Sequence, residues 1–163
     1  MKAVLYAYPL LKTVEEDYAQ HIKNKALLSY NSRLTTEALA EYLAEEILHK
    51  NRLVWLKEII EKTVARLPEH ERVLLGIRYF GKKREREFAV YQQKNLGLNC
   101  NERQYFRLQK RLSEKISGML YAAGVTKTLF DNELADIELF RKIYRYIEKR
   151  QKSEAEGQNS SVS

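Results

Sequence analysis

Apolar residues recur along this chain at intervals of three and four positions, the spacing that places them on one face of an α-helix. The first such pattern covers residues 10–29, and Pro9 fits the first turn of that helix, where a missing N–H costs little. No segment alternates apolar and polar residues with the period of two that is typical of a half-buried strand. The pattern therefore predicts an all-α fold of about six helices.

A second pattern predicts a long helix that runs to about Arg66. Either Thr35 or Thr36 can cap its N-terminus, because a threonine hydroxyl accepts a hydrogen bond from a free backbone N–H of the first turn. The polar residues 49–52 mark a bend or an exposed turn within the helix. Its second half has a near-heptad spacing, which is compatible with a homodimer but is better explained by packing within the chain. The residues with that spacing are Leu53, Leu56, Ile60 and Leu67.

Pro68 restarts the helical pattern, because proline disfavours the α conformation of the preceding Leu67 and is itself well placed at the start of a helix. Gly81 is a natural C-terminal stop for this helix. A shorter helix follows a basic loop and ends at Gly97. The expected inner face of the helix after Pro68 comprises Val73, Leu74, Ile77 and Phe80.

The next helix is long, basic and amphipathic, and it ends near Ala123. Two caps compete at its start, because Asn99 with Glu102 and Asn101 with Gln104 both have the spacing of a reciprocal capping box. The expected inner stripe comprises Tyr105, Leu108, Leu112, Ile116 and either Met119 or Leu120. Because Tyr105 occupies that stripe, we expect the neighbouring Phe106 either to be exposed or to pack under another helix.

The last helix is predicted over residues 128–150, with basic residues opposite an apolar face. We expect the apolar face to pack on the core and the basic residues to be solvated, rather than the helix to bind a membrane surface. The small polar residues that follow it predict a disordered tail. The expected organisation is a helical N-terminal region over 1–66, a helix-turn-helix region over 67–124, a C-terminal helix over 125–152 and a disordered tail over 153–163.

The distribution of charge narrows the class of partner. The formal net charge is +7, and residues 72–115 contain 12 basic and 4 acidic residues, a local excess of +8. A concentrated excess of one sign favours binding to nucleic acid or another acidic surface over a merely solvated helix face. Duplex DNA is the expected partner, since the sequence contains no recognisable RNA-binding module.

Little in the sequence supports catalysis. The three histidines, His21, His49 and His70, lie far apart, and no phosphate-binding glycine loop is present. Cys100 lies in a turn near basic residues, but a lone cysteine without a general base is better interpreted as a small turn residue. We therefore expect no enzymatic activity and no metal or organic cofactor.

The sequence also predicts a cytoplasmic protein that does not enter a membrane. It has no run of about 18 apolar residues. Its N-terminal apolar run is broken by Pro9 and Lys12 and lacks the cleavage site of a signal peptide. A single cysteine suits a reducing compartment.

The segment 67–120 holds the arrangement that a DNA-reading helix requires. The helix after Gly97 has a capped N-terminus that can face phosphate, long polar side chains in its first turns and an apolar stripe that holds it to a support. Arg103 and Gln104 are residue types suited to bidentate contacts with guanine and adenine. The candidate DNA-binding residues are Asn101, Arg103, Gln104 and Arg107 at the helix start, Lys110, Arg111 and Lys115 further along it, and Lys82, Lys83, Arg84 and Arg86 in the preceding loop.

Three motifs in this segment resemble known DNA-binding families. LPEHERVLLGIRYF is similar to the opening helix of the fourth region of bacterial sigma factors, and NLGLN before a basic helix resembles the turn that precedes their promoter-reading helix. NERQYFRLQKRLSEKI resembles phage late-gene regulators of the ArpU/RinA type, whose recognition helix carries a polar residue, two aromatics and an arginine. That pattern falls here on Gln104 to Arg107.

The resemblance implies a helix-turn-helix protein like sigma factor region 4 that binds promoter-type DNA, regulates transcription and can contact RNA polymerase. It implies Asn101 as the helix cap and Tyr105 as the residue that locks the helix to the core. The implied DNA-facing residues are Arg103, Gln104 and Arg107.

Two alternatives to this function stay open. Residues 1–66 have no match to the DNA-melting region of a sigma factor, so the chain can be a sigma-like subunit that needs a partner chain for promoter melting. It can also be a helical adaptor or anti-sigma-type protein, whose basic patch binds an acidic protein surface.

Overall fold

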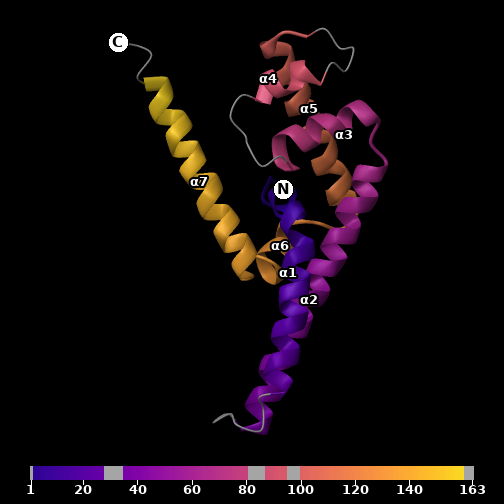
Figure 1. Cartoon of the computed structure of the whole chain (residues 1–163), viewed down its shortest axis with the longest axis vertical. Coiled ribbons are helices and arrows are strands. Elements are labelled where there is room, and N and C mark those ends of the chain that lie inside the picture. The colour runs from indigo at the N-terminus through magenta and orange to yellow at the C-terminus, as the bar shows by residue number, and fades with distance from the viewer. Residues whose placement is uncertain (1, 28–34, 81–86, 95–99, 160–163) are drawn as a thin grey trace. The chain divides into compact units, whose positions relative to one another are not determined.

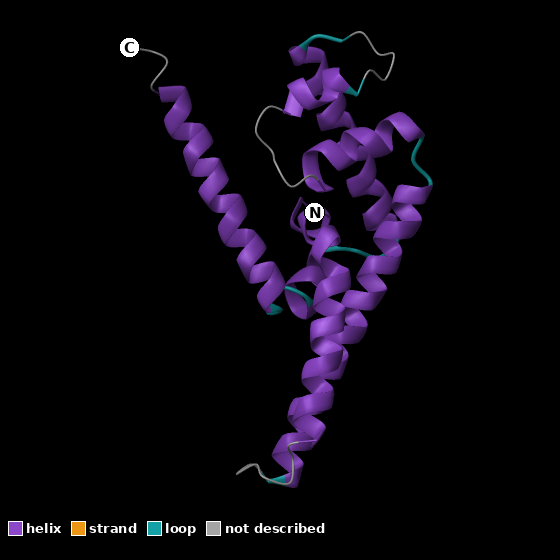
Figure 2. Cartoon of the chain, viewed as in Figure 1, coloured by secondary structure: helices purple, strands orange, loops and turns teal. Residues whose placement is uncertain are grey.

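The computed structural model describes residues 2–27, 35–80, 87–94 and 100–159, with side chains up to residue 149 (Figure 1). Every regular element within these residues is helical, and none is a strand (Figure 2). The prediction of an all-α fold is therefore confirmed. The elements are α1 (Lys2–Leu27), α2 (Thr36–Ala65), α3 (Glu69–Leu75), the π-helical segment η2 (Gly76–Phe80), α4 (Glu87–Gln93), α5 (Glu102–Ala122), α6 (Lys127–Glu133) and α7 (Glu138–Asn159).

The chain forms two compact units that share helix α2. Unit 1 comprises Met1–Trp55 and Lys127–Ser163, and unit 2 comprises Leu56–Thr126. The second half of α2 thus belongs with the segment that is expected to bind DNA. The C-terminal helices belong with the N-terminal ones, so the compact units differ from the four consecutive segments that the sequence indicates.

Helix α1 begins at Lys2, so the start expected near residue 10 is wrong, and Pro9 lies inside the helix. The five consecutive residues Ala3–Ala7 are all buried, which means that apolar side chains surround the first turns on every side. Burying one Val or Leu side chain contributes about 1.5–3 kcal/mol, whereas proline inside a helix costs about 3 kcal/mol. Burial of several such residues therefore outweighs the cost of Pro9.

Helix α2 starts as the sequence predicts, because Thr35 Oγ1 accepts a hydrogen bond from the Ala38 N–H at 3.2 Å. The exposed turn that was one of the two expectations for residues 49–52 does not occur, since α2 is helical throughout. Arg52 instead forms an ion pair with Glu133 of α6. The residues with near-heptad spacing are buried in the chain itself, which confirms the interpretation of intramolecular packing. They are Leu53, Leu56, Ile60 and Leu67.

The helix expected over residues 128–150 is two helices, α6 and α7. The break brings the rings of Phe130 and Phe140 together edge to face, with centroids 4.9 Å apart. A straight helix would hold residues ten positions apart at about 15 Å along its axis, so it could not form this contact. Both rings are buried. Leu134 and Ile137, which lie in the link between α6 and α7, are buried as well.

Helix α7 packs against α1, and the rings of Tyr6 and Tyr146 meet at 6.1 Å. None of the described helices is long and apolar enough to cross a membrane.

The backbone of α7 is helical as far as Asn159, which differs from the disorder expected from residue 153. Glu154, Ala155 and Glu156 favour the helix, and adding residues to an existing helix costs less than starting one. Residues 160–163 lie outside the described part of the chain.

Candidate nucleic-acid interface

Unit 2 places α3 and η2 beneath the helix that is expected to read DNA. Helix α3 begins at Glu69, directly after Pro68, as the sequence predicts. The ψ angle of Pro68 is 155°, which is extended. The π-helical segment then changes which side chains face inward: Ile77 and Tyr79 are buried, whereas Phe80 is only partly so. The prediction of Phe80 in the inner face is wrong because a π-turn holds more residues than an α-turn and shifts the register.

Helix α5 begins at Glu102, and a reciprocal capping box closes its N-terminus. The Asn101 side-chain oxygen accepts from the Gln104 N–H, and the Gln104 side-chain oxygen accepts from the Asn101 N–H, both at 2.9 Å. Of the two competing caps, the structure therefore contains Asn101 with Gln104. A bidentate contact with adenine needs both the oxygen and the nitrogen of the amide, so Gln104 makes one only if its oxygen accepts a second hydrogen bond or the box opens.

The inner face of α5 contains a polar residue that the apolar pattern does not reveal. Tyr105, Leu112, Ile116 and Leu120 are buried as expected, but Gln109 is buried with them and Leu108 is only partly buried. Gln109 lies one turn from Tyr105 and three residues from Leu112, a spacing that places it on the same face. That spacing is the signal in the sequence that could have identified it.

Gln109 and Tyr105 form a hydrogen-bonded network that ties α5 to its two supporting helices. Gln109 Nε2 donates to the backbone oxygen of Leu74 and to the Tyr105 hydroxyl, both at 2.8 Å. The Tyr105 hydroxyl donates to Glu87 Oε2 of α4 at 3.4 Å. Burial raises the pKa of Tyr105 to about 12, so the hydroxyl keeps its proton at neutral pH and remains a donor. A second link joins the Tyr79 hydroxyl to Ser113 Oγ at 3.2 Å.

Aromatic rings hold α4 against the start of α5. The Tyr105 ring lies 5.1 Å from Tyr91 and 5.9 Å from Phe88, measured between centroids. Burial, and then a hydrogen bond with the Cys100 thiol, raise the pKa of Tyr91 to about 12. Cys100 thus lies against the cluster as a half-buried free thiol. The ring centroids of Phe106 and Tyr105 lie 5.2 Å apart. The Phe106 side chain is 45% exposed, which is the first of the two environments expected for it.

The opposite face of α5 carries cations that no acidic side chain of the described residues neutralises. Four exposed basic residues follow one another at helical spacing on this face. None of them forms a hydrogen bond or ion pair with another residue of the described chain. We call these residues the basic face: Arg103, Arg107, Lys110 and Arg111.

Lys115 differs from the basic face although it lies on the same helix. Its Nζ lies 2.6 Å from Glu71 Oε2 of α3, so its charge is compensated within unit 2. Lys115, a candidate DNA-binding residue, thus also links α5 to α3. The four loop residues Lys82, Lys83, Arg84 and Arg86 lie outside the described residues.

No family model, curated protein or solved structure matches this chain. Within the described residues, no group of three His, Cys, Asp or Glu side chains is arranged to hold a metal ion. What unit 2 can do chemically therefore follows from its own geometry. It presents a rigidly supported helix with a capped N-terminus, an unpaired basic face and an exposed aromatic ring.

Proposed function

We propose that this protein is a DNA-binding regulator of transcription, and that α5 reads promoter-type duplex DNA from the major groove. The observation that carries the proposal is the unpaired basic face on a helix whose other side is fixed in the core of unit 2. The major groove of B-DNA admits an α-helix, and phosphates attract its basic side chains. The sequence resemblance to sigma factor region 4 and to phage late-gene regulators supports the same function.

The residues of the basic face have different roles in this proposal. Arg103 and Arg107 lie within the first two turns of α5, the part that contacts base edges in related motifs. Lys110 and Arg111 lie one turn further along, where a straight helix passes the phosphate backbone. Asn101 caps the helix and leaves the other free N–H groups of the first turn available to a phosphate.

The first test is the salt dependence of binding to duplex DNA. If Lys110 and Arg111 neutralise two phosphates, the plot of log K against log salt has a slope of about −1.8, and affinity falls about tenfold between 50 and 200 mM salt. Fluorescence anisotropy of a labelled promoter-type duplex with the full chain measures this. An affinity that does not change with salt would contradict the proposal.

The second test compares two lysines of α5. Lys110→Ala should weaken binding to selected and scrambled duplexes alike and make the salt slope shallower by about 1, because one phosphate contact is lost. Lys115→Ala is the matched control: its charge is already paired with Glu71, so the slope should change much less. Its main cost is about 0–1 kcal/mol of stability, the typical contribution of an exposed ion pair. A larger loss of DNA affinity for Lys115→Ala would show that a different part of α5 contacts DNA.

The same measurements separate the alternatives. An adaptor that binds an acidic protein surface would show no retention of duplex DNA at moderate salt. A sigma-like subunit would bind DNA but would support transcription by RNA polymerase only when a partner chain that melts promoters is added. A footprint on the DNA upstream of its own coding sequence would give the site length and would show whether two copies bind.

A further inference from the structure

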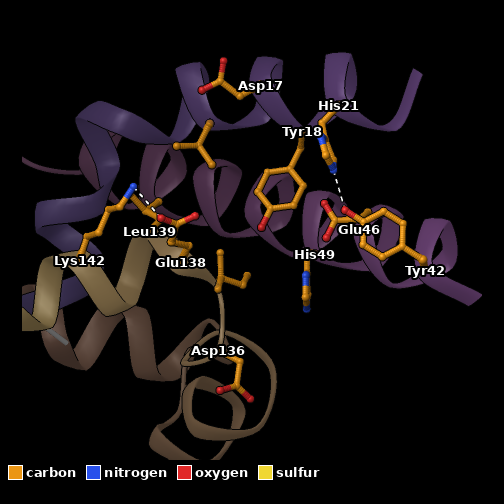
Figure 3. A pocket seen from close by; sticks show the side chains of 12 residues that line it. Asp17, Tyr18, His21, Tyr42, Glu46, His49, Asp136, Glu138, Leu139 and Lys142 are labelled. Carbon is orange, nitrogen blue, oxygen red and sulfur yellow. Dashed lines mark hydrogen bonds and ion pairs between the residues drawn. The ribbon is translucent and has the colours of Figure 1, made fainter. Parts of the chain in front are cut away.

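Unit 1 contains a cavity of about 660 Å³ that has no part in the proposed DNA contact (Figure 3). It lies between α1, α2 and the link from α6 to α7. Its size is within the range of sites that hold small molecules, about 300–1,000 Å³. Val14, Ile137 and Leu139 provide an apolar floor, and Tyr18 and His49 provide aromatic walls.

The charge of the cavity is opposite to that of the chain. Four carboxylates and one lysine line it, whereas the whole chain has a net charge of +7. Two carboxylates are neutralised nearby: Lys142 Nζ lies 2.8 Å from Glu138 Oε1, and Arg141 pairs with Asp136 at 3.1 Å. Glu46 forms no hydrogen bond or ion pair with another residue of the described chain, so its charge is uncompensated.

Tyr18 lines the cavity together with the carboxylates of Glu46 and Glu138. Its ring meets His49 edge to face at 6.4 Å. Burial first, and then the charges of Glu46 and Glu138, raise the pKa of its hydroxyl. Carboxylates from two different helices therefore act on one point in the cavity, next to an aromatic ring.

These features limit the class of ligand. Phosphates and carboxylates are disfavoured, because they would meet carboxylates of the same sign. A divalent metal ion needs several close oxygen or nitrogen ligands, and the described residues contain no such group of three. An organic cation remains, since it can use the carboxylates, the ring faces and the apolar floor together.

We propose that the cavity binds a guanidinium group carried on an aliphatic stem. A guanidinium offers two parallel N–H donors to a carboxylate, here that of Glu46, and it stacks on aromatic faces such as that of Tyr18. The aliphatic stem lies along the apolar floor of Val14, Ile137 and Leu139. The group can belong to a free small molecule or to an arginine side chain of another protein, and both present the same chemistry.

The test is calorimetric titration of the full chain with agmatine, a four-carbon stem that carries a guanidinium at one end and an ammonium at the other. Glu46→Gln removes the charge and keeps the shape, so it should weaken agmatine binding about tenfold, the effect of losing one charge-assisted hydrogen bond. Glu45→Gln is the matched control, because Glu45 is the exposed neighbour on α2 and does not line the cavity. Its affinity for agmatine should equal that of the unaltered chain.

Two further ligands complete the experiment. Putrescine, with an ammonium in place of the guanidinium and the same total charge, should bind more weakly than agmatine. A Gly-Arg-Gly peptide that binds more tightly than agmatine would assign the site to a protein partner, and the reverse order would assign it to a free molecule. The proposal is overturned if neither guanidinium compound binds at millimolar concentration, or if Glu45→Gln and Glu46→Gln weaken binding equally.

Discussion

Replacing Tyr105 by alanine is expected to lower the free energy of unfolding by about 3–5 kcal/mol. The Tyr105 ring is fully buried and contacts the rings of Phe88, Tyr91 and Phe106, so alanine would leave a cavity at the junction of α4 and α5. The substitution also removes the hydroxyl that accepts from Gln109. Because typical domains are stable by only about 5–15 kcal/mol, unit 2 would lose much of its stability.

Urea denaturation of the full chain, followed by circular dichroism, measures this effect. Tyr105→Phe keeps the ring and removes only the hydroxyl, so it should cost about 1–3 kcal/mol by leaving Gln109 and Glu87 without one partner. Tyr121→Ala is the control on the same helix, because Tyr121 is 65% exposed and should change stability by less than about 0.5 kcal/mol. Equal effects of Tyr105→Ala and Tyr121→Ala would show that Tyr105 does not hold α5 in place.

The second large effect is expected in sequence discrimination. Arg103→Ala and Arg107→Ala should each reduce the preference for a selected duplex over a scrambled one about 5- to 150-fold, which corresponds to 1–3 kcal/mol per lost bidentate base contact. Arg111→Ala removes an equal charge further along α5, so it should weaken binding to both duplexes without changing their ratio. Competition binding of the three variants against the two duplexes gives the comparison.

The outcome of that comparison depends on how α5 enters the groove. If Arg111→Ala relaxed the preference and Arg103→Ala did not, the helix would contact bases through its middle and the proposed orientation would be wrong. Gln104→Ala is expected to lower the preference less than either arginine substitution, because its side-chain oxygen already caps the helix.

Features that depend on nearby residues could be predicted from the sequence. Pro68 and the capping box of Asn101 with Gln104 act within one turn, so residue types are enough to locate the start of α3 and to limit the start of α5 to two competing caps. The buried stripe of α5 follows from helical periodicity in the same way. The exposed basic residues of α5 then lie opposite that stripe by geometry alone, which is why the exposed face of α5 could be predicted.

Features that depend on tertiary burial could not be predicted. The early start of α1 and the break before α7 reflect which side chains the core accommodates, and neither has a local signal such as glycine or proline at the right place. The pairing of Lys115 with Glu71 joins residues 44 positions apart, so the ion pair of this candidate DNA-binding residue could not be predicted from local sequence. The spacing of Gln109 indicates the buried face, but its hydrogen bond to Leu74 depends on how α3 packs against α5, 35 positions away in the sequence.

The π-helical segment η2 makes the packing of α3 against α5 sensitive to the deletion of a residue in this segment rather than to the substitution of Gly76. Gly76 has open space where a Cβ would be, so its replacement by alanine introduces no clash. Deleting Gly76 is different, because loss of one residue would return the segment to an ordinary α-helix and turn the residues before it by about 100° relative to those after it. Glu71 and Leu74 would then turn away from Lys115 and Gln109, while Tyr79 could still reach Ser113. A deletion of one codon here would therefore free one side of α5 from its support, although a point mutation at the same codon would leave it intact.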